Sequence, residues 1–215
     1  MSSPMIISLD GNIGAGKSTL LAKIRESIPE LNIIPEPVDT WTSLKMGDSG
    51  KNLLELFYED KKRWAYTFQN CAILTRLQTI QDVIEDPSSN SNVFMTERSV
   101  LTDRYVFAEM LYKSGDINDI EWQLYNKWFN TFAKKLPIKG IVYLTTSPET
   151  SQKRIKIRNR HGEENIHTDY LDALDNQHHT WISTTDLPVL QISTEEGVDM
   201  DNTIQKIKEF IGNLI

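Results

Sequence analysis

The sequence contains little cysteine and no long hydrophobic run. Cys71 is the only cysteine among the 215 residues, so an intramolecular disulfide is excluded and a reducing compartment is favoured. Because Cys71 lies among apolar neighbours in a helical stretch, we expect it to be buried rather than to act as a nucleophile. No apolar segment approaches the ~20 residues that a membrane-spanning helix needs. We therefore expect neither a disulfide-stapled secreted domain nor a transmembrane protein.

Basic residues are also scarce. The chain has 30 acidic and 23 basic residues, which gives a net charge of -7. Proteins that bind the phosphate backbone of a long nucleic acid usually carry a basic surface, so no nucleic-acid partner is expected. The first residues, Met1 to Pro4, contain neither a basic region nor an apolar signal segment. We therefore expect a cytoplasmic protein without a membrane partner.

Short apolar segments alternate with longer helical patterns along the chain. Strands are expected at residues 5–9, 32–34, 93–95, 140–144 and 188–192. Helices are expected at residues 17–27, 51–84 with a break near Asp60, 100–114, 119–135, from Pro148, 168–182 and 200–214. This alternation predicts a single domain over residues 1–215 with an α/β fold of the P-loop NTPase type. Its five-stranded parallel sheet would be flanked by helices, in three layers.

A glycine-rich loop follows the first expected strand, and from Gly11 to Ser18 it is a complete Walker A motif. Its glycines let backbone N–H groups turn towards phosphate oxygens. Lys17 can reach the β- and γ-phosphates, and the Ser18 hydroxyl can bind Mg²⁺. The residues expected to contact a triphosphate here are Gly11, Asn12, Ile13, Gly14, Ala15, Gly16, Lys17, Ser18 and Thr19. A glycine-rich turn without nucleotide is the alternative, but a chance match is on the order of one in a hundred.

Acidic residues follow the second and third expected strands, at the edge where parallel sheets bind ligands. Glu36 precedes Pro37, which holds it extended, and its carboxylate can accept a proton from an attacking hydroxyl. Glu97 stands where a Walker B acid would hold Mg²⁺, and Arg98 can pair with Glu36. The alternatives are a solvated loop acid at position 36 and a surface ion pair of little energetic weight.

Arg154, Arg158 and Arg160 lie on and after the helix expected from Pro148. Arg154 and Arg158 are four residues apart and share one helical face. Beside a polar loop, these side chains can close over a triphosphate and neutralise the charge of the transferred group. We therefore expect an arginine-bearing lid at about residues 154–166. A basic face turned to solvent is the alternative, which the overall acidity of the chain disfavours.

With these units placed, the chain resembles the deoxynucleoside kinase family, in its deoxycytidine, deoxyguanosine and deoxyadenosine kinase branch. The resemblance runs nearly the whole length of the chain. Its most specific motifs are Gly11 to Ser18, Glu36-Pro-Val-x-x-Trp41, Arg63-Trp-x-x-Thr-Phe68-Gln69, Glu97-Arg-Ser-Val-x-x-Asp103-Arg-Tyr, Glu121-Trp and Arg158-x-Arg160. It implies transfer of the γ-phosphoryl group of ATP, with Mg²⁺, to the 5′-hydroxyl of a deoxynucleoside in nucleotide salvage.

The resemblance also implies roles for single residues. Glu36 would be the general base, supported by Arg98, and Glu97 the acid near Mg²⁺. Gln69 would read the base edge, with Trp41 and Phe107 as aromatic walls. Tyr58 and Glu163 would hold the sugar 3′-hydroxyl. Glu164 stays an alternative, because the family does not usually have His161-Gly162 between the arginine and this glutamate. The expected nucleoside site comprises Glu36, Trp41, Phe57, Tyr58, Phe68, Gln69, Arg76, Arg98, Asp103, Phe107 and Glu163.

Arg76 and Asp103 bear on which base is bound. They match a charged pair of the deoxycytidine and deoxyguanosine branch, where the thymidine-accepting branch has small or apolar residues. An ionised Asp103 accepts a hydrogen bond from an exocyclic amine and repels a carbonyl, so a purine deoxynucleoside or deoxycytidine is expected over thymidine. Phe57, where a methionine is common, would narrow the pocket and leaves the choice among these open. The run from Gly115 to Trp122 is most similar to deoxyguanosine kinases and favours a purine.

Family members are typically dimers through the helices near residues 119–135, so the resemblance implies a homodimer. Trp122, Trp128 and Phe132 are expected in core or dimer packing. His178 and His179 are expected on a helix surface rather than in a metal site, since helical neighbours point in different directions. Two other functions stay open: a thymidine- or pyrimidine-preferring kinase, and a P-loop regulatory switch that signals by shape.

Overall fold

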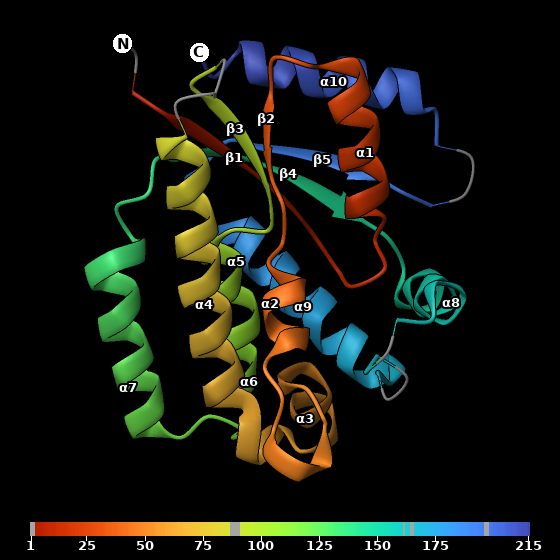
Figure 1. The fold of residues 1–215 in the computed structure, drawn as a ribbon. Helices are drawn as coiled ribbons and strands as arrows, with labels where there is room; N and C mark the ends of the chain where they lie inside the picture. The colour runs from red at the N-terminus through yellow and green to blue at the C-terminus, as the bar shows by residue number, and fades with distance from the viewer. Residues whose placement is uncertain (1–2, 87–90, 161, 164–165, 196–197) are drawn as a thin grey trace.

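The computed structural model of the chain describes residues 3–86, 91–160, 162–163, 166–195 and 198–215. Within these residues, five parallel strands form one sheet in the order β2-β3-β1-β4-β5 (Figure 1). The strands are β1 Met5–Gly11, β2 Asn32–Ile34, β3 Val93–Glu97, β4 Ile138–Thr145 and β5 Val189–Ser193. The α/β fold with a five-stranded parallel sheet is confirmed.

Helices cover both faces of the sheet. Their bounds are α1 Lys17–Ser27, α2 Val38–Ser43, α3 Leu53–Glu59, α4 Lys61–Glu85, α5 Val100–Thr102, α6 Glu109–Lys113, α7 Asp119–Trp128, α8 Pro148–Arg158, α9 Thr168–Thr184 and α10 Met200–Gly212. A 3₁₀ turn, η1, spans Gly47–Ser49, and two π-helical segments, η2 and η3, span Asp103–Ala108 and Phe129–Ala133. The helices expected at 100–114 and 119–135 thus each contain a π-helical segment. The sequence pattern does not predict α2 or η1.

The helical break expected near Asp60 is confirmed, and a cap explains it. Asp60 ends α3, and its side chain accepts a hydrogen bond from Arg63 N at 3.1 Å at the start of α4. The start of α3 is fixed similarly by Asn52 and Glu55, which form a reciprocal capping box. These caps set the positions of two helices that both contribute side chains to the site.

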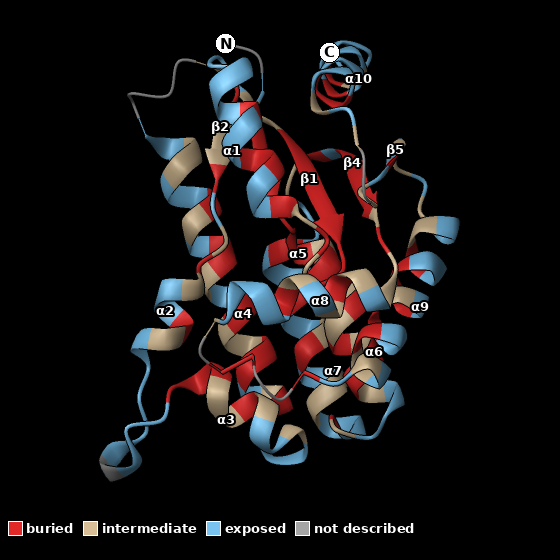
Figure 2. Cartoon of the chain, turned by 90° about the vertical axis from the view of Figure 1, so that its right-hand side faces the viewer, coloured by how far each residue is buried: buried red, intermediate tan, exposed pale blue. Residues whose placement is uncertain are grey.

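Alternate residues of the central strands belong to two separate cores. On β1, Ile6 packs with a cluster that includes residues of α4 and α9, whereas Ile7 and Leu9 pack with residues of α1 and α10. Figure 2 shows the strands β1 and β4 mostly buried in the interior of the fold. A sheet covered on both faces requires nearly continuous apolar strands, which is the pattern that the sequence shows.

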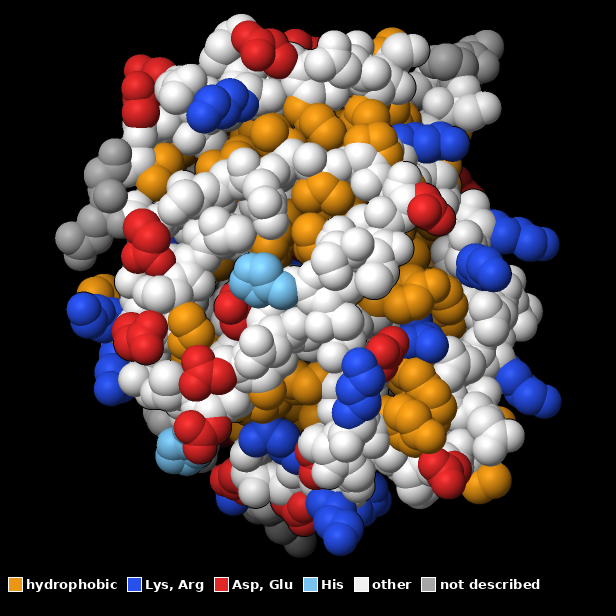
Figure 3. Space-filling model, turned by 180° about the vertical axis from the view of Figure 1, so that it is seen from behind, with side chains coloured by type: hydrophobic (Ala, Val, Ile, Leu, Met, Phe, Trp, Pro, Cys, Tyr) orange, Lys and Arg blue, Asp and Glu red, His pale blue; other side chains and the backbone are white. Residues whose placement is uncertain are grey.

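The surface mixes charges of both signs. On the face opposite to the view of Figure 1, Lys and Arg side chains are interspersed with Asp and Glu, and apolar side chains form several separate groups (Figure 3). Cys71, on α4, is half-buried, and burial raises the pKa of its thiol, which disfavours the reactive thiolate. None of the helices in the described ranges is long and apolar enough to cross a membrane.

Gly11, the last residue of β1, permits a close approach between two strands. Its φ is +145°, and a Cβ added there would lie 2.7 Å from the carbonyl oxygen of Leu144 on β4. The P-loop leaves the sheet at this residue. A side chain at Gly11 would therefore strain the backbone and push the loop away from β4.

Gly11→Ala is expected to lower the free energy of unfolding by about 2–4 kcal/mol, because it adds backbone strain to overpacking against Leu144. Gly212→Ala is the matched control, since no described atom lies within 4 Å of its added Cβ and α10 gains up to about 1 kcal/mol from alanine. Urea unfolding monitored by circular dichroism measures both effects. Equal changes in the two variants would contradict the close approach at Gly11.

Candidate active site

Two adjoining pockets lie at the edge where the carboxyl ends of the strands meet. One (the central pocket) is enclosed by side chains from α2, α3, α4 and η2 and by Arg158, Arg160 and Glu163. The other (the P-loop pocket) lies between the P-loop, α8 and the segment after β5. Four residues line both pockets: Gly14, Lys17, Glu97 and Arg158. The structure thus brings the predicted P-loop, strand-end and lid residues together.

Lys17, the first residue of α1, is buried between the two pockets. Its Nζ donates hydrogen bonds to the carbonyl oxygens of Gly11 at 3.0 Å and Asn12 at 2.7 Å. Burial, and next the nearby Arg98, lower the pKa of Lys17 to about 7. Phosphate oxygens placed beside this amino group would favour its charged form.

The remaining P-loop residues divide between the pockets. Gly14, Ala15, Gly16, Lys17, Ser18 and Thr19 line the P-loop pocket. Ile13 lines the central pocket instead. Gly11 and Asn12 hold Lys17 through their backbone carbonyls, which accept its hydrogen bonds. The side-chain Nδ2 of Asn12 donates to the carbonyl of Leu171 at 2.9 Å. This bond ties the loop to α9, so Asn12 anchors the loop within the fold.

Ser18 and Glu97 face each other across the P-loop pocket. The Ser18 hydroxyl lies 3.1 and 3.3 Å from the two carboxylate oxygens of Glu97. The described part of the chain has no group of three or more His, Cys, Asp or Glu residues that could hold a metal. A hydroxyl and a carboxylate beside a phosphate loop nevertheless fit Mg²⁺, which is commonly bound by one or two protein oxygens together with substrate phosphates and water.

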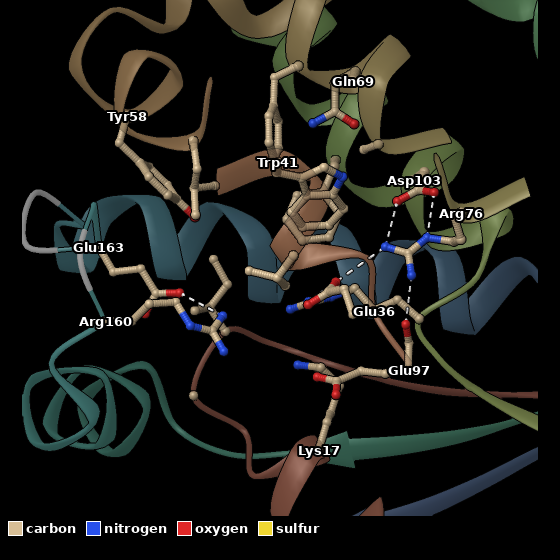
Figure 4. A pocket seen from close by; sticks show the side chains of 18 of the residues that line it. Lys17, Glu36, Trp41, Tyr58, Gln69, Arg76, Glu97, Asp103, Arg160 and Glu163 are labelled. Atoms are coloured by element: carbon tan, nitrogen blue, oxygen red, sulfur yellow. Dashed lines mark hydrogen bonds and ion pairs between the residues drawn. The ribbon is translucent and has the colours of Figure 1, made fainter. Parts of the chain in front are cut away.

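Glu36, which follows β2, lines the central pocket and is held by two guanidinium groups. Arg98 Nη1 donates to its Oε1 at 2.8 Å. Arg76 Nη2 donates to the same oxygen at 3.2 Å (Figure 4). Burial alone would raise the pKa of Glu36, but Arg98, Arg76 and Lys17 together lower it to about 2. The structure therefore contains the ion pair expected between Glu36 and Arg98, and the carboxylate is ionised and oriented.

Arg98 has an unusual backbone conformation for a residue with a side chain. Its φ is +58°, in the left-handed region. The backbone N–H still donates to the carbonyl of Leu9 at 3.0 Å, and the guanidinium lies 5.1 Å from the ring centroid of Phe107. This turn at the end of β3 places Arg98 against Glu36 while Glu97, one residue earlier, reaches the P-loop pocket. Such strained residues cluster at functional sites.

Arg76, on α4, is the most deeply buried charge of the central pocket, with 1% of its surface exposed. Its Nε donates to Asp103 Oδ2 at 2.8 Å, and Nη2 donates to Oδ1 at 3.3 Å. Nη1 donates to the carbonyl of Glu97 at 2.7 Å. Burial raises the pKa of Asp103, and Arg76 opposes that shift. The predicted charged pair is thus present and is joined to Glu36 through the same guanidinium (Figure 4).

The wall beside this pair is aromatic and contains one unpaired amide. Gln69 is 1% exposed, and its Oε1 has no hydrogen-bond partner among the described residues. Trp41 and Phe68 pack edge to face, with ring centroids 5.3 Å apart, and Phe107 also lines the pocket. Buried polar atoms are rarely left unpaired, so the Gln69 amide is placed to bind a ligand.

Phe57 does not line the central pocket, in contrast to the prediction. Its ring stacks on Phe68 with centroids 4.6 Å apart and an interplanar angle of 16°. Tyr58, the next residue of α3, takes the pocket-facing position instead. Phe57 therefore lies behind the wall and supports Phe68, because successive helical residues point in different directions.

Tyr58 and Glu163 lie on the side of the central pocket away from Arg76 (Figure 4). Glu163 is buried and accepts hydrogen bonds from Arg158 at 2.6 Å and Arg160 at 3.3 Å. Burial, and next Glu163, raise the pKa of Tyr58 well above its ordinary value. The tyrosine hydroxyl is therefore kept protonated beside the carboxyl group of Glu163. This pairing of a donor with an acceptor suits a sugar hydroxyl.

The three predicted lid arginines differ in position. Arg154 lines the P-loop pocket, Arg158 lines both pockets, and Arg160 lines the central pocket rather than the expected triphosphate site. The hydrogen bond that Arg160 donates to Glu163 holds its side chain at the central pocket. Glu164, the alternative to Glu163, lies outside the described residues, as do residues 161 and 165 of the predicted lid.

The P-loop pocket has a further wall that sequence reasoning missed. It is formed by Ile157 on α8 and by Thr194, Glu195, Val198, Met200 and Thr203 after β5. Arg154 Nη2 donates to the carbonyl of Thr194 at 2.5 Å, which joins α8 to this wall. The rule that ligands bind after the carboxyl ends of parallel strands marks this segment as it marks those after β2 and β3.

The expectation of a surface position is wrong for His178 and right for His179. His178 is fully buried, its Nδ1 donates to the carbonyl of Leu174 at 2.8 Å, and its ring stacks on Tyr143. Burial lowers the pKa of His178 to about 3, so the ring is neutral. It lies on the face of α9 that packs on the sheet, one turn after Leu174.

Comparison with known proteins agrees with this geometry. The family model for deoxynucleoside kinases matches residues 7–215. Deoxycytidine kinase 2 of Gallus gallus is 35% identical, over 95% of this chain and 89% of its own. A fowlpox virus protein with the name Probable deoxycytidine kinase is 38% identical, over 97% and 88% of the two chains. The mitochondrial deoxyguanosine kinase of Xenopus laevis is 33% identical, over 97% and 90%. The chain therefore belongs to the deoxynucleoside kinase family and is an ATP-dependent nucleoside kinase.

Proposed function

We propose that this protein transfers the γ-phosphoryl group of ATP to the 5′-hydroxyl of a deoxynucleoside and so forms the 5′-monophosphate for nucleotide salvage. One observation carries the proposal: the P-loop pocket and the central pocket share Gly14, Lys17, Glu97 and Arg158 as a common wall. A triphosphate on the P-loop and a hydroxyl beside Glu36 would meet at that wall. We take residues 1–215 as one kinase domain and expect it in the cytoplasm, where Cys71 stays reduced.

In this reaction Glu36 accepts a hydrogen bond from the 5′-hydroxyl and takes its proton as the oxygen attacks the γ-phosphorus in line. The new bond joins the 5′-oxygen to phosphorus, and the bond from phosphorus to the β–γ bridging oxygen breaks to leave ADP. A carboxylate with a pKa of about 2 is a weak base. Because the transition state of phosphoryl transfer is loose, the proton leaves late, when the new bond to phosphorus has made it acidic, so a weak base suffices if it is positioned on the hydroxyl.

Cationic groups surround the path of the transferred phosphoryl group. Lys17 and Arg158 lie on the shared wall, and Arg154 lies on the P-loop side. We assign them to the negative charge of the β- and γ-phosphates. Mg²⁺ held by Ser18 and Glu97 would neutralise charge on the same oxygens. Arg160 bonds Glu163 and, unlike Arg158, lines only the central pocket, so we assign it to holding that carboxylate.

The central pocket favours bases that carry an exocyclic amine. The Gln69 amide and the Asp103 carboxylate lie on the same side of the pocket (Figure 4). A carboxylate held by Arg76 accepts from an amine and repels a carbonyl. The curated relatives are named for deoxycytidine and deoxyguanosine. We therefore propose a purine deoxynucleoside or deoxycytidine as the substrate, in preference to thymidine.

A phosphorylation assay with Mg²⁺-ATP and deoxyadenosine, deoxyguanosine, deoxycytidine or thymidine tests the proposal. We expect kcat/KM for the best amine-bearing nucleoside to exceed that for thymidine by at least about tenfold. This is the effect expected when one substrate makes a hydrogen bond to the protein that the other cannot make. A dominant thymidine activity would overturn the pocket argument. ATP consumption that does not depend on a nucleoside would overturn the kinase proposal.

The double variant Arg76→Leu/Asp103→Ala tests whether the pair of Arg76 and Asp103 sets the preference for amine-bearing bases over thymidine. Removing both Arg76 and Asp103 leaves neither of these two charges without the other, and Glu36 keeps its ion pair with Arg98. The thymidine share of kcat/KM is therefore expected to rise at least about tenfold. Arg104→Leu/Glu109→Ala, which removes a 2.9 Å ion pair outside both pockets, is the control and should leave the ratio of bases unchanged. An unchanged ratio in both variants would show that the pair does not set base choice.

Glu36→Gln is expected to lower kcat at least about 100-fold, the usual contribution of a positioned base, while nucleoside Kd changes less than about threefold. Because the pKa of Glu36 is about 2, the carboxylate is ionised throughout pH 5–8. Its protonation should therefore cause no fall in wild-type kcat/KM on acidification to pH 5. Glu59→Gln, at an exposed glutamate paired with Lys51, is the control. Turnover near the wild-type rate in Glu36→Gln would remove the assignment.

We also propose that the protein is a homodimer through α7 and η3. Ile120, Leu124, Trp128 and Phe132 recur every four residues and are exposed, although all four are large and apolar. Trp122 packs on Tyr112 with ring centroids 4.7 Å apart and belongs to the core instead. A second copy that presents the same stripe would bury these side chains in an isologous contact.

Leu124→Glu is expected to convert the dimer into a monomer, because it places a charge in the centre of this apolar stripe. Light scattering after gel filtration measures the molar mass. Met46→Glu, at an exposed methionine elsewhere, controls for the added charge and should stay dimeric. A Leu124→Glu variant with the mass of a dimer would contradict the proposed interface.

A further inference from the structure

Glu195 joins two segments that are far apart in the sequence. Its Oε1 accepts hydrogen bonds from Ser147 N at 2.5 Å and from Thr146 Oγ1 at 3.2 Å, and its Oε2 accepts one from Thr150 Oγ1 at 2.8 Å. Ser147 is the N-cap of α8, and Thr150 lies in its first turn. The carboxylate therefore reaches from the segment after β5 to the N-terminus of α8.

The neighbouring Thr194 links the same segment to the P-loop. Its Oγ1 donates to the carbonyl of Ala15 at 2.9 Å, and its own carbonyl accepts from Arg154 Nη2 at 2.5 Å. The P-loop also touches α8 directly, because a Cβ added at Gly14 would lie 2.6 Å from the carbonyl oxygen of Ser151. The P-loop, α8 and the segment after β5 thus form one connected unit around the P-loop pocket.

The position of α8 decides where two cations of the pocket lie. Arg154 and Arg158 project from α8 into the P-loop pocket. An ionised carboxylate at a helix N-terminus is favourable because the helix dipole is positive there. The N–H of Ser147 and then the hydroxyl of Thr150 lower the pKa of Glu195 to about 2, so it stays ionised at neutral pH. Glu195 is itself acidic, and so it is poorly suited to contact a triphosphate directly.

We propose that Glu195 is a positioning residue for the phosphoryl donor. Its carboxylate holds the N-terminus of α8 against the segment after β5, and this contact keeps Arg154 and Arg158 turned towards the triphosphate. The inference rests on the proposed kinase activity, but it concerns the donor side alone. It predicts a defect in the use of ATP without a matching defect in the use of the nucleoside.

Steady-state kinetics of Glu195→Ala, with each substrate varied in turn, test the proposal. We expect KM for ATP to rise about tenfold, within the range expected when hydrogen bonds to a charged group are lost, while KM for the nucleoside changes less than about twofold. Glu195→Gln is the rescue variant, since its amide can accept from Ser147 N and donate to Thr150 Oγ1. Its KM for ATP should stay within about threefold of the wild type. An equal defect in the Gln and Ala variants would overturn the proposed contact.

A second test asks whether Glu195 acts through Arg154. In an Arg154→Ala background, Glu195→Ala should raise KM for ATP by less than in the wild-type background, because residues that act as a unit are non-additive. Fully additive effects would contradict action through Arg154. Thr150→Val removes a single bond to Glu195 and provides a milder variant, with an expected rise of about threefold in KM for ATP.

Asn118→Ala is the matched structural control. It removes the N-cap of α7, which accepts from Ile120 N and Glu121 N, outside both pockets. It should lower Tm and leave both KM values unchanged. If wild-type protein lacks nucleoside-dependent activity, the proposed function fails. If wild-type protein is active and Glu195→Ala leaves KM for ATP unchanged, or raises both KM values equally, the positioning role alone is overturned.

Discussion

The buried guanidinium of Arg76 is the interaction on which the central pocket depends. It connects α4 to three other parts of the fold: the carboxylate of Glu36 after β2, the carbonyl of Glu97 at the end of β3, and Asp103 at the start of η2. A buried charge is strongly destabilising when it loses a partner, by about 3–5 kcal/mol. The four elements must therefore pack together for this guanidinium to be satisfied. In the proposed reaction, recognition of the base and orientation of the attacking hydroxyl would thus share one support.

Charge balance explains how an acidic protein can bind a polyanion at this site. In the central pocket, Arg76 and Arg98 pair with Glu36 and Asp103, and Arg158 and Arg160 pair with Glu163. In the proposed reaction, such paired charges would orient a neutral nucleoside. On the P-loop side, the arginines at positions 154 and 158 add positive charge. A triphosphate on the P-loop would therefore be attracted locally, although the whole chain has a net charge of -7.

The sequence predicted the sheet, most helices and the P-loop because each depends on local pattern: apolar runs, helical periodicity and glycine at fixed spacing. The Asp60 break also follows from a local cap. The pairing of Glu36 with Arg98 could be proposed because parallel strands end at one edge. The second bond of Glu36, to Arg76, could not be predicted, since that contact depends on how α4 packs over the sheet.

The predictions that were wrong, and the contact that was missed, also depend on how elements pack together. Phe57 and Tyr58 are adjacent and both aromatic, and only the rotation of α3 decides which one faces the pocket. His178 and His179 differ in burial because one faces the sheet. Glu195 carries no motif, and its bonds to the start of α8 join segments more than forty residues apart. Such long-range contacts leave no local pattern in a single sequence.

The most direct measurement is the distance between the nucleoside 5′-oxygen and the Glu36 carboxylate in a complex with Mg²⁺-ADP and deoxycytidine or a purine deoxynucleoside. The account predicts a hydrogen bond of about 2.6–3.2 Å, with the Gln69 amide paired to the base and the β-phosphate beside Lys17. A nucleoside bound with its base towards the P-loop, or with no oxygen within hydrogen-bond distance of Glu36, would contradict it.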